Sequence, residues 1–403
     1  MYKITIGDNT VVGTNEDAWR TASQIWFETG KNGEYGACFT GSRWIGENSY
    51  AAQSGMNEHG LVYSRLGSYH PQKSEWEGKQ KKKILQPDIF LKQILHKCKN
   101  VREVHDLLEE YDHSIYIQDV FIFIDQSGQY LIVEPYSMSL GTEANYVLSN
   151  FCPSITLEDQ RRELGRYRKG TDVIAMGVDS SLTYCTSLSK AMHVCREKNG
   201  DGTLLTGIWN IKNREVNLYF YHDYSQGVSF NIQDELAKGD HAIDILTLFP
   251  TNVEFEQLKS YVTPFNSPKL RISIALLGVF FLISSLLFGF SLIRNRSMKH
   301  RTFKGLFSLL CLIMFCYMLV LATNIGVYYF EAPYVHFNSN FISISSYIPF
   351  IMLLAILPSI RINYKIIKEG SWSLFWKFLL TLNNVFLIIL FMAFFYWGLY
   401  DVL

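Results

Sequence analysis

Four long apolar runs occupy the C-terminal third of the chain, over Ile272–Ile293, Leu306–Phe330, Ile342–Ile360 and Leu374–Leu399. Each run is close to the ~20 residues that a helix needs to cross the hydrocarbon core of a bilayer. Helices buried in a soluble core can also be apolar, but four such runs in succession without an amphipathic stripe favour a membrane. Serine and proline dilute the third run, although a bilayer helix tolerates proline. The pattern predicts an all-α, four-helix transmembrane domain over residues 268–403.

Residues 1–267 show short β-rich runs bounded by turn residues, alternating with segments whose apolar positions repeat every three or four residues. The expected strands are Thr10–Val12, Gln24–Phe27, Leu61–Leu66, Val120–Ile124, Tyr130–Val133, Leu204–Asn210, Val216–Tyr221 and Val228–Ile232. The expected helices cover residues 90–98, a segment capped by Asn100, Leu157–Met176 and Ser181–Lys198. This mixture predicts an α+β or layered α/β domain over residues 1–267.

Composition and charge separate the same two parts. The 403 residues include 28 Phe, 24 Tyr and 8 Trp, which excludes a disordered or collagen-like chain. The formal net charge is zero, yet residues 1–267 hold 26 Lys and Arg against 34 Asp and Glu, whereas residues 268–403 hold 11 against 3. The basic run Lys79–Lys83 has no interleaved aromatics and lies in this acidic domain, so we interpret it as a solvated loop and predict no nucleic-acid partner.

Basic residues between the apolar runs indicate an orientation. The connections Arg294–Lys304 and Arg361–Lys377 are rich in Lys and Arg, whereas Gly326–Ser343 has neither. The positive-inside rule therefore places the basic connections in the cytoplasm and residues 1–267 outside, although Lys269 and Arg271 argue weakly the other way. An external N-terminal domain needs a secretory signal, and the first ten residues do not resemble one. Either the topology is different or the true N-terminus precedes Met1.

Common catalytic signatures are absent from the sequence, including the nucleophile elbow, the P-loop, the dinucleotide-binding glycine motif, H-E-x-x-H and C-x-x-C. The ten histidines lack ligand spacing, so we predict neither a metal nor a cofactor. Five of the seven cysteines lie in residues 1–267, and their spacing suggests no disulfide framework. Cys185 and Cys195 fall ten residues apart on one expected helix, too far to bridge.

Four segments, in order, resemble the choloylglycine hydrolase and penicillin V acylase family of linear-amide hydrolases with an N-terminal nucleophile. They are Val12–Trp19, similar to its Gly-Arg-Asn-x-Asp-Trp motif, Gly55–Leu61, similar to its Gly-x-Asn-Glu-x-Gly-Leu hairpin, Tyr146–Asn150 and Gly165–Tyr167. The stretch Thr203–Tyr221 also fits the closing hairpin of the family. The resemblance covers about 240 residues of the chain. It does not include the four apolar helices.

The resemblance implies a four-layer αββα sandwich that cleaves a non-peptide amide C–N bond of a small molecule. The nucleophile would be a cysteine at the mature N-terminus, whose own α-amine serves as general base. Asn150 would stabilise the oxyanion, Asp17 would hold the N-terminal ammonium or thiol, and Arg166 would lie near the thiol or orient Asp17. Each residue also has an ordinary interpretation, since Asp17 ends a strand, Asn150 precedes a turn and Arg166 lies in a basic segment. Asn57 and Gly60 fit a tight turn, so we assign them a structural role.

Two departures from the family bear on activity. Thr14 stands where most of the family has an arginine, and no cysteine occurs before Cys38, which lies in an expected strand. Family spacing places the nucleophile one or two positions before Met1. One hypothesis is therefore an enzyme whose start was assigned at an internal methionine, with a signal peptide and the cysteine upstream. The alternative is a membrane-bound sensor or transport-associated protein that binds amides without cutting them. The residues do not distinguish hydrolysis from acyl transfer.

Overall fold

A computed structural model describes residues 1–17, 23–46, 49–196, 201–294, 300–328 and 340–401. The chain divides into two compact units, Met1–Lys259 and Ser260–Leu403. The sequence pattern places the division at residues 267 and 268, just before the first long apolar helix. Ala18 and Trp19 of the first motif, and most of the connection Gly326–Ser343, lie outside the described residues.

The first unit is built on two large antiparallel sheets. Across the seven-stranded sheet the order is β14 (Asn145–Val147), β1 (Tyr2–Ile6), β2 (Asn9–Asp17), β16 (Asp201–Asn210), β17 (Glu215–Phe220) and β18 (Asp223–Asn231), with β15 (Cys195–Arg196) paired to β16. Across the eight-stranded sheet it is β13 (Ser137–Gly141), β12 (Tyr130–Glu134), β11 (Asp119–Ile124), β8 (Val62–Gly67), β7 (Ser54–Asn57), β4 (Ala37–Gly41), β3 (Gln24–Glu28) and β19 (His241–Asp244). Two small two-stranded sheets join β5 (Arg43–Gly46) to β6 (Ser49–Ala51) and β9 (Lys82–Lys83) to β10 (Tyr111–Asp112).

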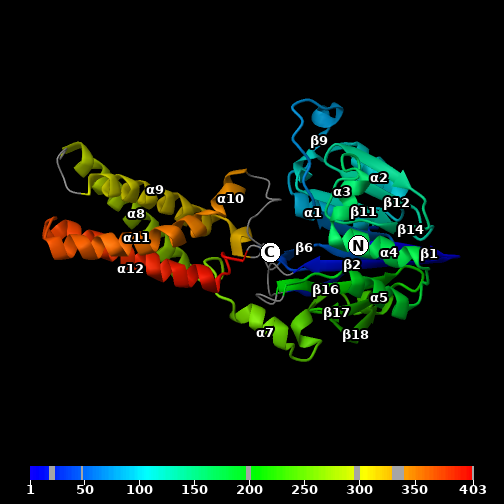
Figure 1. Cartoon of the computed structure of the whole chain (residues 1–403). Helices are drawn as coiled ribbons and strands as arrows, with labels where there is room; N and C mark the ends of the chain where they lie inside the picture. Colours follow the sequence, from blue (N-terminus) through cyan, green and yellow to red (C-terminus); the bar gives the residue numbers. More distant parts are fainter. Residues whose placement is uncertain (18–22, 47–48, 197–200, 295–299, 329–339, 402–403) are drawn as a thin grey trace. The chain divides into compact units, whose positions relative to one another are not determined.

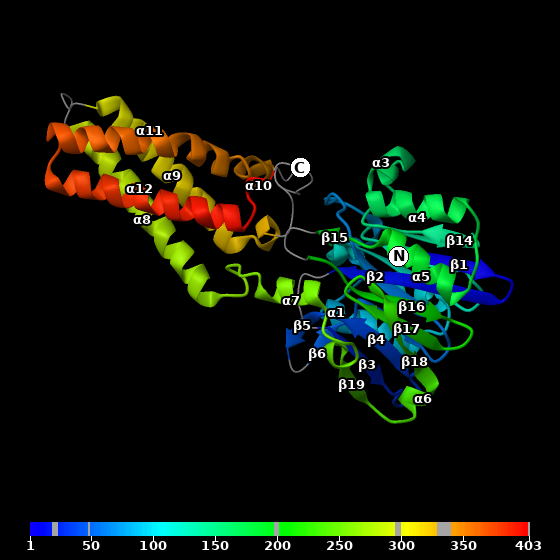
Figure 2. The same cartoon turned by 60° about the horizontal axis from the view of Figure 1, so that its bottom comes forward.

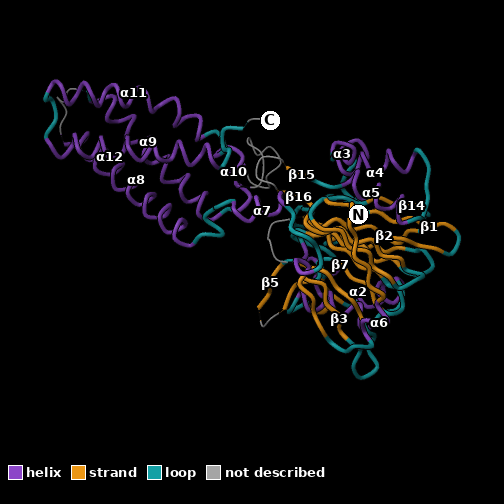
Figure 3. Tube along the Cα trace, turned by 90° about the horizontal axis from the view of Figure 1, so that it is seen from below, coloured by secondary structure: helices purple, strands orange, loops and turns teal. Residues whose placement is uncertain are grey.

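Helices cover both sheets, since α4 and α5 contact strands of the seven-stranded sheet and α1 and α2 contact strands of the eight-stranded sheet. Figure 3 shows α3, α4 and α5 beside the strands. The helices of this unit are α1 (Pro87–Lys97), α2 (Val101–Glu109), α3 (Glu158–Glu163), α4 (Gly165–Ala175), α5 (Leu182–Met192), α6 (Ile232–Leu236) and α7 (Val253–Ser260), the last of which reaches the division. Short 3-10 helices are η1 (Glu77–Gln80), η2 (Ser114–Tyr116) and η3 (Ile245–Thr247). The four layers confirm the predicted α+β sandwich.

The main apolar core lies between the eight-stranded sheet and helices α1 and α2. Phe39, Tyr63 and Phe123 project from the sheet towards Ile94 and Leu95 of α1, and all five are fully buried. The predicted cap is confirmed, because the Asn100 side chain accepts hydrogen bonds from the first backbone N–H groups of α2. Continuous apolar strands such as β11 are buried on both faces, which explains why they do not alternate.

Two predicted helices differ from the structure. The helix expected over Leu157–Met176 breaks at Leu164, whose extended backbone separates α3 from α4. The helix expected over Ser181–Lys198 ends at Met192, and Cys195 lies in strand β15 instead. The cause is tertiary, because Thr203 N donates to Val194 O at 2.8 Å and draws this segment into the sheet.

The second unit contains four helices long and apolar enough to cross a membrane, spanning Pro268–Arg294, Arg301–Thr323, Phe341–Glu369 and Leu374–Tyr396. Its elements are α8 (Pro268–Arg294), α9 (Arg301–Thr323), η4 (Ile325–Tyr328), α10 (Asn340–Ser345), α11 (Ile348–Glu369) and α12 (Leu374–Tyr396). Figures 1 and 2 show the long helices side by side. The predicted four apolar helices are confirmed, and the third includes α10 as well as α11.

Polar side chains connect these helices in their buried interior. Asn383 of α12 donates to Ser284 Oγ of α8 at 3.0 Å, and Ser359 of α11 donates to Asn384 Oδ1 at 2.6 Å. Leucine, isoleucine and phenylalanine cover the outward faces, with Leu276 65% exposed within this unit. Such a distribution is typical of helices that face lipid outside and satisfy polar groups inside.

Candidate active site

Asp17 and Arg166 meet in the first unit, although 149 residues separate them in the sequence. Asp17 ends β2, and Arg166 is the second residue of α4. Arg166 Nη2 lies 2.7 Å from Asp17 Oδ2, and Thr203 Oγ1 donates to Asp17 Oδ1 at 3.3 Å. The Asp17 and Arg166 side chains are 31% and 16% exposed, so the pair is partly shielded from water. A charged pair with a second hydrogen bond fixes the orientation of the carboxylate.

The neighbouring arginines have other partners. Arg162 forms an ion pair with Asp172, and Arg161 donates to the carbonyl oxygens of Thr156 and Pro153. The structure therefore distinguishes Arg166 within a basic segment in which the sequence left several arginines equivalent.

The amino end of the chain is buried beside this pair. Met1 is 6% exposed, and its nitrogen donates to Leu148 O at 2.9 Å while Leu148 N donates to Met1 O at 3.1 Å. Burial lowers the pKa of the Met1 ammonium to about 5, with a further lowering by Arg166 and an opposing contribution from Asp17. The N label in Figure 1 marks this position within the first unit. The start of β1 therefore lies close enough to Asp17 and Arg166 for their charges to shift the pKa of the Met1 amine.

Asn150 lies two residues beyond Leu148, which holds Met1. Its Nδ2 donates to Gly67 O at 2.8 Å, and its side chain is exposed. It makes no hydrogen bond to Asp17 or Arg166 among the described residues. Because an amide nitrogen carries two hydrogens, one donor of Asn150 is not used by Gly67.

Thr14, which replaces the family arginine, is occupied within the sheet. It is 2% exposed, its hydroxyl donates to Gly207 O at 3.3 Å, and it accepts from Trp209 Nε1 at 3.2 Å. Thr14 therefore does not supply the missing guanidinium group. Arg166, which comes from a different element, is the cation that contacts Asp17.

Glu16 is a buried carboxyl group that sequence reasoning missed. It is 5% exposed and accepts from Thr40 Oγ1 at 2.5 Å, which links the two large sheets. Burial raises its pKa to about 7, while the Thr40 hydrogen bond opposes that rise. Since successive strand residues point to opposite faces, Glu16 turns away from Asp17 into the space between the sheets. An acidic residue within the largely buried strand β2 is the sequence feature that could have identified this buried carboxyl group.

Asn57 and Gly60 have the structural role that the sequence predicts. Asn57 is fully buried, its amide donates to Leu95 O and Cys98 O, and its oxygen accepts from His59 N and Leu61 N. Gly60 has a φ of +80°, which favours glycine. Both residues fix the turn between β7 and β8.

Cys38 has the environment of an inert thiol. It lies in β4 with no exposed surface, and burial raises its pKa well above the ordinary value. A thiolate is the nucleophilic form of cysteine, so this residue is unsuited to the role.

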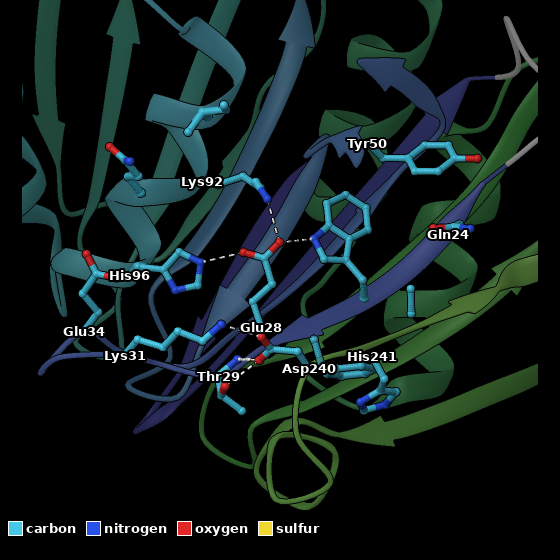
Figure 4. Close-up of a pocket in the computed structure, with 15 residues that line it drawn as sticks. Gln24, Glu28, Thr29, Lys31, Glu34, Tyr50, Lys92, His96, Asp240 and His241 are labelled. Carbon is cyan, nitrogen blue, oxygen red and sulfur yellow. Dashed lines mark hydrogen bonds and ion pairs between the residues drawn. The ribbon is translucent and has the colours of Figure 1, made fainter. Parts of the chain in front are cut away.

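A separate pocket of about 570 Å³ is lined by residues of β3, α1 and β19, shown in Figure 4. Its centre is Glu28, which accepts from Lys92 Nζ at 2.6 Å and Trp26 Nε1 at 3.0 Å, and lies 2.9 Å from His96 Nε2. Burial alone would raise the pKa of Glu28, but hydrogen bonds from His96 and Lys92 lower it to about 2. Glu28 is paired with Lys92 and His96, and Lys31 with Asp240. None of Asp17, Asn150 and Arg166 lines the pocket.

Comparisons with known proteins bear on the first unit. Residues 14–150 match the model of the linear amide C–N hydrolases, choloylglycine hydrolase family. A comparison of the sequence with curated proteins finds no match.

Solved structures with a similar chain path include a variant of conjugated bile acid hydrolase from Clostridium perfringens, with 15% identity, a TM-score of 0.46, and coverage of 62% of this chain and 97% of that one. Penicillin V acylase from Agrobacterium tumefaciens has 14% identity, a TM-score of 0.44, and coverage of 60% and 90%. The N-acylethanolamine-hydrolyzing acid amidase ortholog from Caenorhabditis elegans has 11% identity, a TM-score of 0.37, and coverage of 52% and 92%. The family match confirms the resemblance predicted from the motifs: over residues 14–150, this chain is similar to the linear amide C–N hydrolases of the choloylglycine hydrolase family.

Proposed function

We propose that the first unit is a linear amide C–N hydrolase that acts on small acylated amines or amino acids, anchored to a lipid bilayer by the four apolar helices. The family match supports the reaction class. The observation that carries the proposal is the Asp17–Arg166 ion pair beside the buried start of β1, where residues preceding Met1 would lie. In a hydrolase with an N-terminal nucleophile, the reacting residue and its amine belong in such an environment.

The register of β1 supports a nucleophile upstream of Met1. Tyr2 pairs with Gly13, so continuing the antiparallel register places Met1 opposite Thr14 and the two preceding residues opposite Asn15 and Glu16. A cysteine at either preceding position would lie next to the strand end that carries Asp17. The spacing expected from the family resemblance leads to the same two positions.

Each site residue then has a defined role. The cysteine thiol would transfer its proton to its own α-amine, and the sulfur would attack the amide carbon. Asn150 would donate to the resulting oxyanion, and Asp17 would hold the ammonium, with Arg166 orienting Asp17. The ammonium proton would pass to the leaving amine as the C–N bond breaks. Water would then hydrolyse the thioester and restore the thiol.

We further propose that residues 1–267 lie outside the cytoplasm and residues 268–403 form the anchor. The basic connections Arg294–Lys304 and Arg361–Lys377 support this orientation through the positive-inside rule. Protease protection in sealed vesicles tests it, because an external first unit is digested from the outer side while the helices survive.

Activity is tested on the full chain expressed with its natural upstream codons. N-acyl amino acids and bile-salt conjugates form the substrate panel, with release of the free amine as the readout. An upstream Cys→Ala variant and Asp17→Asn should lose turnover, and exposed Glu163→Gln should not. Ligand binding without turnover of any amide would favour the alternative of a binding sensor, as would an in-frame stop codon before any cysteine.

A further inference from the structure

Cys195, His222 and Glu254 converge at a second site in the first unit, from three separate segments. Cys195 lies in β15, His222 in the turn between β17 and β18, and Glu254 at the start of α7. One ligand atom from each residue, a thiol sulfur, an imidazole nitrogen and a carboxylate oxygen, lies within 4.8 Å of the other two. The cluster is the one such group of three that the described residues contain.

The imidazole of His222 has an unused buried nitrogen. Its side chain is 6% exposed, and its Nδ1 lies 3.2 Å from Glu254 Oε2. Its Nε2 is buried and has no hydrogen-bond partner. A buried polar atom without a partner costs about 1–3 kcal/mol, so its presence requires an explanation. A metal ion bound at Nε2 would remove that cost, and Glu254, which now contacts Nδ1, would turn towards Nε2 to complete the site.

The backbone at His222 has an unfavourable left-handed conformation. Tyr221 and His222 have φ values of +50° and +57°, and they form the two-residue turn between Phe220 and Asp223. Such turns ordinarily use Asn or Gly, because a larger residue in the left-handed region costs about 1 kcal/mol. Gly202 faces the ring, and a Cβ atom there would lie 2.3 Å from Nε2. Both features keep the imidazole beside Cys195, the register partner of Gly202.

We propose that Cys195, His222 and Glu254 form a zinc site. Zn²⁺ binds thiolate sulfur, imidazole nitrogen and carboxylate oxygen, whereas Ca²⁺ and Mg²⁺ prefer oxygen alone. Tetrahedral coordination requires ligand atoms about 3.4 Å apart, given Zn–ligand distances of about 2.0–2.3 Å. Glu254 is 58% exposed, so its side chain has room to move by the remaining distance. Three protein ligands leave a fourth position for water or for His193, whose ring centroid lies 5.7 Å from that of His222.

The site is connected to Asp17 through one residue. Thr203 follows Gly202, its Oγ1 accepts from Val194 N at 3.0 Å, and the same hydroxyl donates to Asp17 at 3.3 Å. Zinc bound at Cys195 would fix the pairing of β15 with β16 and hence the hydroxyl that contacts Asp17. The three ligands would therefore act on the proposed active site indirectly, as positioning residues, through the Thr203 hydroxyl that contacts Asp17.

The test measures metal content and a spectroscopic signature on the full chain in detergent. Zinc is quantified per chain after dialysis, and Zn²⁺ affinity is measured by competition with a chromogenic chelator. The proposal predicts one zinc per chain and an affinity at least about tenfold lower in Cys195→Ser, His222→Asn and Glu254→Gln. His105→Asn is the matched control, because His105 also lies near two carboxylates, 3.5 Å from Asp106 and 3.7 Å from Glu109.

Cobalt substitution keeps the proposal testable if a variant does not fold. Co²⁺ bound to the unaltered chain should show a thiolate-to-metal charge-transfer absorption. The proposal is overturned by the absence of that band, by substoichiometric zinc in the unaltered chain, or by equal Zn²⁺ affinity in the folded Cys195→Ser variant. Its failure is distinguishable from failure of the amidase proposal, because neither readout depends on turnover.

Discussion

Replacing Glu16 by glutamine should stabilise the first unit at neutral and alkaline pH. Glu16 is 5% exposed, and burial raises its pKa to about 7 from an ordinary 4.5, although Thr40 and Ser54 beside the carboxyl group partly oppose that rise. Glutamine keeps the oxygen that accepts from Thr40 and removes the charge that burial penalises. Ser54 lies beside the carboxyl group and offers its hydroxyl oxygen to the new amide.

The sign and size of the effect follow from proton linkage. Between pH 4.5 and 7 the folded chain binds more protons at Glu16 than the unfolded chain, so stability falls as the pH rises. The full cost is reached above pH 7, where the difference in pKa corresponds to about 3 kcal/mol. Below pH 4.5 the carboxyl group is neutral in both states and Glu16→Gln should have little effect. For a unit of this size, each kcal/mol shifts the melting temperature by about 2–4 °C.

The assay is thermal unfolding of the full chain in detergent at pH 4 and pH 8, followed by near-ultraviolet circular dichroism. Glu163→Gln serves as the control, since Glu163 is exposed. Glu16→Gln should raise the melting temperature at pH 8 relative to both the unaltered chain and the control. An equal shift at pH 4 and pH 8, or a destabilised variant at pH 8, would refute the assignment of a buried charge to Glu16.

Three other substitutions test separate parts of the account. Asn150→Ala, in the chain with its upstream residues, should lower kcat by about 10²–10³ with a smaller change in KM, because an oxyanion donor acts in the transition state; an unchanged kcat would contradict its role. Cys38→Ala should leave amide hydrolysis intact, since that thiol is fully buried, and loss of turnover in a folded variant would reveal a role that its burial argues against. Asn57→Ala should cost at least about 3 kcal/mol in denaturant unfolding, because four backbone groups lose their partner. Asn213→Ala, at an exposed turn, is the comparison.

Local patterns predicted much of the architecture. The four apolar helices follow from run length alone, and strands such as β11 and β12 lie within a residue or two of the expected ranges. The cap at Asn100 and the turn at Asn57 were also predictable, because both use side-chain oxygens that bond to nearby backbone. These features depend on residues that are close together in the sequence, so the local sequence pattern is enough to predict them.

Features that depend on distant pairing were not predictable in this way. Cys195 falls in a strand because β16 pairs with the segment after α5, and its own neighbours suggest a helix. Arg166 differs from the nearby arginines only through contact with Asp17, 149 residues away. The cluster of Cys195, His222 and Glu254 likewise has no ligand spacing, since its members come from three separate elements.

The central claim is that a cysteine just before Met1 attacks an amide next to Asp17 and Arg166. The most direct measurement is the intact mass of the full chain, expressed with its upstream codons and acid-quenched during turnover, followed by mapping of the acylated peptide. The account predicts a mature N-terminal cysteine one or two residues before Met1, carrying the acyl group as a thioester. An unmodified N-terminal peptide during turnover, or an acyl group on any other residue, would contradict it.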